Sequence, residues 1–285
     1  QWAHEYDWPH HGLTSAAAVL VPVPGGGYLS GWAHRDYDTS WFPYPLLIQR
    51  LDAHGNLIWA KTYVQKGGVA GLAAEPDGSF LIVGADADLG PPMGEWVAKC
   101  DSSGNLQFQA TYYQVPEFFK AHLAADGNVV IMAAYSNDLM KIDSATGAIV
   151  WARAYGYSIP PSDIGLWDSG DFQVTQDGGY VLVGYNYKGG AQNTVVLRMD
   201  PDGIVRWARR YEGGNHAQFV PHIALAPDGG YYLLQDAGPQ DQRVARLDPD
   251  GAILWQKHLI WPTSPGASYS TAPAFAAASD GGCLI

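Results

Sequence analysis

The sequence is poor in cysteine, in charge and in long apolar runs. Two cysteines among 285 residues cannot build a disulfide framework, and no Cys-x-x-Cys pair suggests a bound metal or haem. No apolar run approaches the roughly 18 residues of a membrane-spanning helix, so we expect no membrane insertion. Only 15% of residues are charged, and the net charge of −12 comes without a basic cluster. Nucleic acids and anionic membrane surfaces, which both need a basic patch, are therefore not expected partners.

A sustained helical period is also missing. No stretch of ten or more residues repeats its apolar positions every 3.6 residues, which argues against helices. The chain instead holds 34 Gly and 19 Pro, and its hydrophobic fraction of 47% is enough for a packed core. Short apolar segments separated by turn residues predict an all-β protein.

Two sequence phrases alternate along the chain. One is a strand ending in Asp, a Gly turn and an apolar strand that usually holds Trp; it occurs at residues 50–63, 99–113, 141–155, 198–211 and 246–259. The other is an apolar strand, an Asp-Gly turn and a second apolar strand; it occurs at 75–84, 125–133, 176–184, 227–235 and 279–285, with a degenerate copy at 24–31. Each repeat thus has four short strands, which we number first to fourth. Four-stranded repeats of about 40–50 residues are typical of β-propeller blades.

We expect residues 1–285 to form a single β-propeller domain, most simply with six blades and with seven as the alternative. Residues 1–8 match the fourth-strand phrase, so an N-terminal outer strand would close the last blade and remove free sheet edges. That closing blade has no third strand, which leaves room for strand donation from another chain. The expected blades are about 12–64, 65–114, 115–155, 156–211 and 212–260, followed by an incomplete closing blade at 261–285.

The repeated Asp and Gly residues have a structural explanation. Asp side chains close tight turns by hydrogen bonding and Gly adopts positive φ, whereas a calcium loop of the EF-hand type needs alternating acidic ligands that end in Glu. Cys100 and Cys283 occupy strand positions that are apolar or aromatic in other repeats. We therefore expect no disulfide between them, and two buried thiols without a reactive role.

The phrase Lys141-Ile142-Asp143-Ser144-Ala145-Thr146-Gly147-Ala148-Ile149-Val150-Trp151 resembles the docking phrase of quinoprotein-type propellers. These are the pyrroloquinoline quinone-dependent dehydrogenases and their non-catalytic relatives. The other repeats are similar to the shortened version common in secreted bacterial propellers. The resemblance implies that the phrase locks blades together, and it does not imply the quinone. Because the chain is short and has no adjacent cysteine pair, we expect no cofactor and no metal.

The connections between second and third strands, and between repeats, vary most in length. They share one end of the blades in a four-stranded propeller, and long loops on a rigid scaffold often bind ligands. Aromatic rings and carboxylates in them suit sugars, peptides or cations, although the same rings could simply pack the loops onto the blades. The ligand-binding candidates are Tyr37, Trp41, Tyr44, Tyr157, Trp167, His216 and Trp261.

The first strand of each repeat is expected to line the central channel with alternate residues. In three successive repeats those positions are polar, and they comprise Lys120, His122, Asp171, Gln173 and His222. His122, Asp171 and His222 are the catalytic candidates, because His and Asp side chains can act as an acid/base pair. The alternative is a set of hydrogen-bonded polar residues along a water-filled channel.

Three functions follow from these patterns. The first is a non-enzymatic binding or assembly module that presents aromatic and acidic loops to a protein or carbohydrate partner. The second is a hydrolase or lyase at the channel mouth, and the third is a structural subunit of an extracellular assembly. Low charge and many aromatic residues favour an exported bacterial protein in the periplasm or outside the cell.

Overall fold

The computed structural model describes most of the chain. The described residues are 16–33, 45–64, 69–85, 94–113, 118–133, 138–156, 166, 168–188, 191–212, 221–238, 241–260, 275–278 and 281–284. Within them every regular element is a β-strand and no helix occurs. This confirms the all-β prediction.

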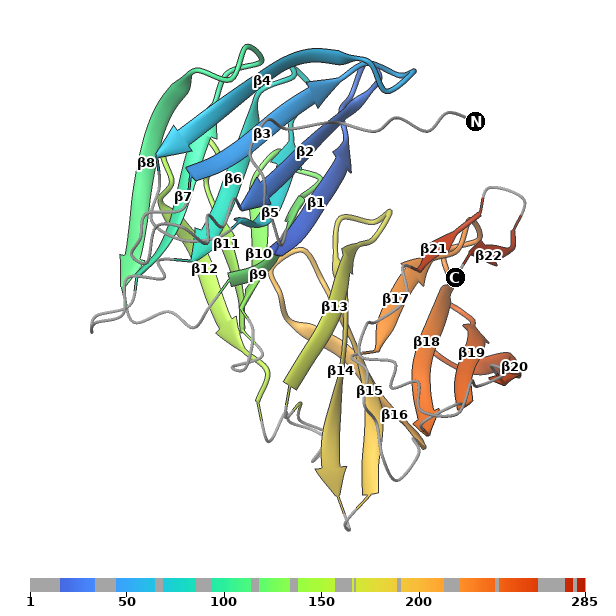
Figure 1. The fold of residues 1–285 in the computed structure, drawn as a ribbon. Helices are drawn as coiled ribbons and strands as arrows, with labels where there is room; N and C mark the ends of the chain where they lie inside the picture. Colours follow the sequence, from blue (N-terminus) through green and yellow to red (C-terminus); the bar gives the residue numbers. More distant parts are fainter. Residues whose placement is uncertain are drawn as a thin grey trace, which may run out of the picture. The chain divides into compact units, whose positions relative to one another are not determined.

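Twenty of the strands form five antiparallel sheets, each with its four strands side by side in chain order (Figure 1). The first sheet holds β1 (Ala16–Pro22), β2 (Tyr28–Ala33), β3 (Pro45–Leu51) and β4 (Leu57–Val64). The second holds β5 (Val69–Ala74), β6 (Phe80–Ala85), β7 (Gly94–Cys100) and β8 (Leu106–Tyr113). The third holds β9 (Phe118–Leu123), β10 (Val129–Ala133), β11 (Asp138–Ile142) and β12 (Ile149–Ala154).

The fourth sheet holds β13 (Asp168–Val174), β14 (Tyr180–Lys188), β15 (Ala191–Met199) and β16 (Val205–Glu212). The fifth holds β17 (His222–Leu225), β18 (Tyr231–Gly238), β19 (Asp241–Leu247) and β20 (Ile253–Ile260). A two-stranded sheet of β21 (Ala276–Ala277) and β22 (Cys283–Leu284) follows. The expected closing strand at residues 1–8 lies outside the described residues.

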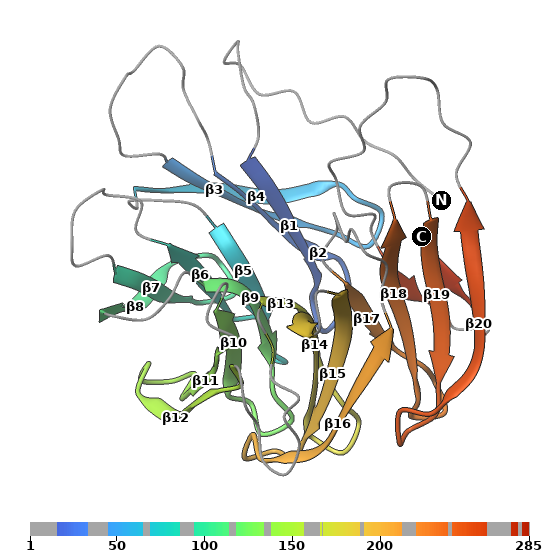
Figure 2. The same ribbon diagram turned by 90° about the horizontal axis from the view of Figure 1, so that it is seen from below.

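The chain divides into two compact units. The first contains the first two sheets and most of the third, and the second contains the fourth and fifth sheets with β21 and β22 (Figures 1 and 2). Middle strands are buried on both faces; β7 and β10 have no exposed residue. In β8 and β12 buried or half-buried residues alternate with exposed ones, which is the pattern of an outer strand.

The Asp-x-x-Gly turns between third and fourth strands are built as the sequence predicts. Asp52 Oδ1 accepts hydrogen bonds from the main-chain N–H groups of His54 and Asn56, both at 2.8 Å. Gly55 closes the turn with φ 82°, a conformation that costs glycine little. The same carboxylate contacts recur at Asp101, Asp200 and Asp248.

The four junctions between consecutive four-stranded sheets carry the same lock. A tyrosine near the end of one sheet's fourth strand donates its hydroxyl to the glycine carbonyl in the next sheet's Asp-x-x-Gly turn. The pairs are Tyr63 with Gly104 (2.6 Å) and Tyr112 with Gly147 (2.5 Å) in the first unit, and Tyr155 with Gly203 (2.7 Å) and Tyr211 with Gly251 (2.6 Å) in the second.

Aromatic packing completes the lock. A Cβ on Gly104 would lie 3.0 Å from the Trp59 ring, and one on Gly251 would lie 2.8 Å from the Trp207 ring. Each ring therefore rests directly on the glycine of the next turn. The blade docking that the family resemblance implied is confirmed at these junctions.

Both cysteines are free thiols. Cys100 is buried in the core of the first unit, where burial raises the pKa of its thiol. The expectation of burial is wrong for Cys283, which is only half-buried and packs beside Ala224 and Tyr232.

Candidate functional site

The five polar residues predicted on the first strands divide between the two units. Lys120 and His122 lie on β9 of the first unit and are half-buried. Asp171 and Gln173 lie on β13, and His222 begins β17, all in the second unit. The structure brings Asp171 and His222 together, whereas Gln173 is half-buried further along β13.

Asp171 and His222 form a close polar pair. His222 Nδ1 lies 3.6 Å from Asp171 Oδ2, which is long for a hydrogen bond and suits an ion pair when the imidazole is protonated. The Asp171 side chain is 5% exposed and the His222 side chain 25%. Within the described residues, the buried Nε2 of His222 has no hydrogen-bond partner.

The Asp171 carboxylate also binds the main chain of the neighbouring sheet. Its Oδ2 accepts a hydrogen bond from the N–H of Ile223 at 3.1 Å. Gly71 occupies the matching position in β5, where a Cβ would lie 2.8 Å from the main-chain nitrogen of Ala121. Ala121 and Ile223 occupy matching positions in their sheets. The first strand of the preceding sheet reaches that main-chain N–H by close packing at Gly71 in one case and through the Asp171 carboxylate in the other. This contact gives Asp171 a structural role.

A β-bulge sets the direction of these side chains. The pairing of β13 with β14 shifts register between Ser169 and Asp171, and the pairing of β5 with β6 shifts between Val69 and Gly71. A bulge bends the strand and changes the direction of the side chain next to it. The following position in β5, Ala73, is 3% exposed and belongs to a core cluster. In that sheet the predicted channel-facing position is therefore packed.

All seven aromatic and histidine candidates lie outside the described residues. By sequence they belong to the β2–β3, β12–β13, β16–β17 and β20–β21 connections, and they are Tyr37, Trp41, Tyr44, Tyr157, Trp167, His216 and Trp261. The strands that flank these connections end on the side of each sheet opposite the tight turns.

Sequence reasoning missed a repeated cation, which is half-buried in the first sheet and buried in the other four. A Lys or Arg stands two residues before each Asp of the Asp-x-x-Gly turns, at Arg50, Lys99, Lys141, Arg198 and Arg246. In four sheets it pairs with an acid at the Asp-Gly turn: Lys99 with Glu75, Lys141 with Asp126 (2.7 Å), Arg198 with Asp177 (2.5 Å) and Arg246 with Asp228. The recurrence of this cation was the signal that could have revealed the pairs.

The pair of Arg198 and Asp177 shifts the pKa of the carboxyl group. Burial opposes ionisation of Asp177, but hydrogen bonds from Thr175 and Gly179 and the charge of Arg198 outweigh it and lower the pKa to about 2. The Arg198 side chain is 8% exposed, so the pair keeps a buried cation neutralised.

Among the described residues, no three His, Cys, Asp or Glu side chains gather as a metal site. No helix in the described part of the chain is long and apolar enough to cross a membrane.

Consecutive four-stranded antiparallel sheets, joined by one repeated lock, define a β-propeller. A family model described as outer membrane protein assembly factor BamB matches residues 47–270, and the chain belongs to this family of quinoprotein-like repeat propellers. No curated protein sequence matches the chain.

Solved structures support the same fold. A catalytically inactive virginiamycin B lyase from Staphylococcus aureus, solved with quinupristin, is 13% identical with a TM-score of 0.56, covering 92% of this chain and 74% of that one. A protein of unknown function from Bacteroides caccae is 12% identical with a TM-score of 0.52, covering 87% and 83%. An apocarotenoid oxygenase variant from Synechocystis is 13% identical with a TM-score of 0.57, covering 88% and 63%. Likeness at this level establishes the fold alone.

Proposed function

We propose that this chain is a non-enzymatic assembly propeller of the bacterial cell envelope, acting in the periplasm or outside the cell. The observation that carries the proposal is the match over residues 47–270 to a family described as an outer membrane protein assembly factor. The partner is a protein, with a carbohydrate as the alternative ligand of the same surface.

The arrangement of the sheets supports loop-mediated binding. At one end of each four-stranded sheet the turns are tight, and those of the Asp-x-x-Gly type after the first sheet accept a tyrosine hydroxyl from a neighbouring sheet. The variable connections with Trp41 and Trp167 leave the opposite end. Variable loops on a rigid scaffold can change their ligand without changing the fold.

Two variants test the proposal. Trp41→Ala and Trp167→Ala should reduce binding to an extended peptide copied from an outer-membrane β-strand, or to glycans on an array, while unfolding curves stay unchanged. Trp255→Ala is the matched control, because Trp255 is 38% exposed on β20 and lies outside those connections. Absence of binding by the native chain, or equal binding by all three variants, would refute the proposal.

A second candidate function is a hydrolase or lyase. The pairing of Asp171 with His222 favours it, because an acid beside an imidazole can set the tautomer and charge of a general base. In that case His222→Gln and Asp171→Asn would each abolish turnover of chromogenic ester and glycoside substrates. For a lyase, they would abolish the formation of unsaturated-sugar products. Native turnover that persists in both variants would rule out this site.

The third candidate is a structural subunit. β20 is the edge strand of the fifth sheet, and Ile253 and Leu254, on its opposite faces, are 48% and 59% exposed, so a strand from another chain could pair along this edge. A stable complex whose assembly depends on Leu254 would support it, and a monomer insensitive to Leu254→Lys would exclude it.

A further inference from the structure

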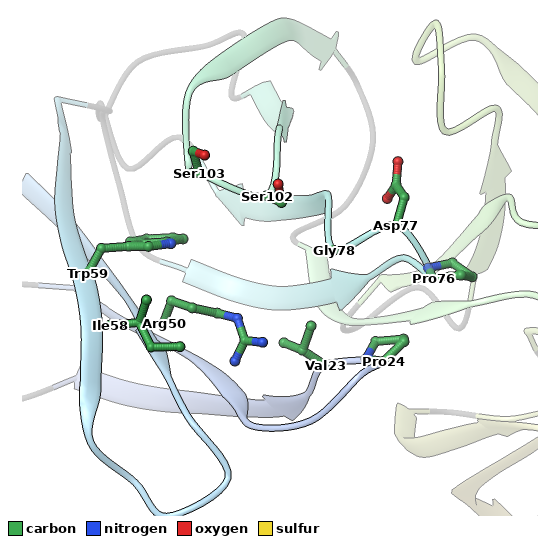
Figure 3. Close-up of a pocket in the computed structure, with 10 residues that line it drawn as sticks. All are labelled: Val23, Pro24, Arg50, Ile58, Trp59, Pro76, Asp77, Gly78, Ser102 and Ser103. Atoms are coloured by element: carbon green, nitrogen blue, oxygen red, sulfur yellow. The ribbon is translucent and has the colours of Figure 1, made fainter.

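A pocket of about 370 Å³ lies between the first two sheets, at their tight-turn end (Figure 3). Arg50, Ile58 and Trp59 line it from the first sheet, and Asp77, Ser102 and Ser103 line it from the second. All belong to the first unit. The volume falls within the range of small-molecule sites, about 300–1,000 Å³.

Arg50 is the repeated cation of the first sheet; it is half-buried, and its guanidinium makes the same main-chain contacts as its buried counterparts. Its Nη1 donates to the carbonyl of Tyr28 at 3.4 Å, as Arg198 Nη1 donates to the carbonyl of Tyr180 at 3.3 Å. Both guanidinium groups also donate to the carbonyl of the following residue. Arg246 follows the same pattern in the fifth sheet.

The carboxylate that completes this pattern is missing in the first sheet. Turn hydrogen bonds align Gly25 with Asp177, the acid that binds Arg198. A Cβ on Gly25 would meet no atom within 4 Å, so the space beside it is open. Arg50 Nη2 donates instead to the neutral carbonyl of Gly26 at 2.7 Å. Within the described residues no carboxylate forms an ion pair with Arg50.

Two of the five N–H donors of Arg50 remain for a ligand. Three are used by main-chain carbonyls, which leaves the Nε–H and one Nη2–H on the edge that binds carboxylates through two parallel bonds. Burial lowers the pKa of Arg50, and the charge of Asp52 opposes this to a smaller extent. The Asp52 carboxylate itself accepts hydrogen bonds within its own turn.

We propose that this pocket binds a small α-amino acid with an apolar side chain, whose carboxylate takes the place at Arg50 that Asp177 and Asp228 fill at the cations of the fourth and fifth sheets. The pocket itself supplies the other two contacts. Figure 3 places Asp77 across the pocket from Arg50 and Trp59.

The far wall suits an ammonium group. Asp77 Oδ1 accepts from the N–H of Ser79 at 2.9 Å and from its hydroxyl at 2.5 Å, whereas no described residue donates to Oδ2. Those bonds from Ser79 lower the pKa of Asp77, so it stays ionised at neutral pH. The hydroxyls of Ser102 and Ser103 add uncharged donors and acceptors.

The near wall suits an apolar side chain. Ile58 is 56% exposed, and the Trp59 ring stacks on Phe80 with centroids 6.0 Å apart, which fixes the ring in place. A carboxylate, an ammonium and an apolar group are therefore recognised by three different parts of the pocket. Because these contacts are separate from the variable connections, the site is independent of the proposed partner-binding function.

The test fills the missing position. Gly25→Asp adds the absent carboxylate, and Gly25→Asn is a neutral control of the same shape; both residues tolerate the positive φ of 87° better than other side chains do. Arg50 itself is left intact because it anchors the turn through three carbonyls. Titration calorimetry and saturation-transfer NMR with L-phenylalanine measure binding.

We expect phenylalanine to bind the native chain and the Gly25→Asn variant with affinities within about threefold, and to bind Gly25→Asp at least about tenfold more weakly, as expected for loss of a charge-assisted contact. Phenylalaninamide, which lacks the carboxylate, and 3-phenylpropanoate, which lacks the ammonium, should both bind more weakly than phenylalanine. Failure of phenylalanine to bind, equal binding to both variants, or undiminished binding of the amide would overturn the proposal.

Discussion

The lock between sheets makes a quantitative prediction at Gly251. This glycine has φ 79°, and a Cβ there would lie 2.8 Å from Cη2 and 3.0 Å from Cζ3 of Trp207. The Cδ of Arg209 would also lie 2.8 Å away, and the Trp207 ring is held by the core cluster, including Tyr231 with ring centroids 6.1 Å apart. Gly251→Ala should therefore be destabilising for two reasons, the backbone conformation and the clash.

Gly127 separates these two costs. It has a similar φ of 83°, but a Cβ there would meet nothing within 4 Å. Gly127→Ala should cost only the conformational term, about 1–2 kcal/mol. Gly251→Ala should cost the same amount plus about 1–3 kcal/mol for overpacking against the ring.

Urea unfolding of both variants, followed by circular dichroism, measures the difference. The free energy of unfolding should fall by about 2–5 kcal/mol for Gly251→Ala and by about half that or less for Gly127→Ala, with little change in the urea dependence. Equal losses in the two variants would show that the ring does not bear on the glycine, and the account of the lock would be wrong.

Three further predictions concern other contacts. Tyr155→Phe removes a buried hydroxyl that donates at 2.7 Å, so the free energy of unfolding should fall by about 1–2 kcal/mol, while the control Tyr113→Phe, at a side chain 62% exposed, should change it little; equal effects would contradict the lock. Asp171→Ala should destabilise the second unit more than Asp171→Asn, whose amide oxygen can still accept the neighbouring main-chain N–H, and thermal melts of the two variants measure this. Burial raises the pKa of Tyr112 to about 12, from about 10 in the unfolded chain, so the unfolded chain loses this proton first and stability should fall as pH rises from about 10 to 12. In Tyr112→Phe the free energy of unfolding should fall less steeply with pH, by up to the slope that one bound proton contributes, and urea titrations at several pH values measure it. An unchanged slope would contradict the prediction.

The fold was predictable because its determinants repeat. Trp59 and Trp207 recur at one position of the repeat, the turn residues Asp52 and Asp248 at another, and such regularity marks the four strands without knowledge of distant contacts. The structure confirms the antiparallel sheets, the turn hydrogen bonds and the docking of Trp59 and Trp207 on the next turn.

The polar residues of the first strands were harder to interpret. Asp171 accepts a hydrogen bond from the main-chain N–H of Ile223, 52 residues further along the chain, and no side-chain pattern in the sequence predicts this contact. Ala73 stands at an alternate first-strand position, of the kind expected to line the channel, but it is buried in a core cluster beside the close approach of Gly71. The empty position at Gly25 became meaningful only once the other repeats showed which acid belongs there.

The uniform lock has a consequence for how such a chain evolves. The four junctions between consecutive four-stranded sheets use the same tyrosine-to-glycine-turn bond, and each lock reaches only the adjacent sheet. A gene duplication or deletion of one whole repeat therefore preserves the chemistry of every remaining junction. The number of blades can change in single steps within a lineage, while the loops and a turn such as that at Gly25 diverge one repeat at a time.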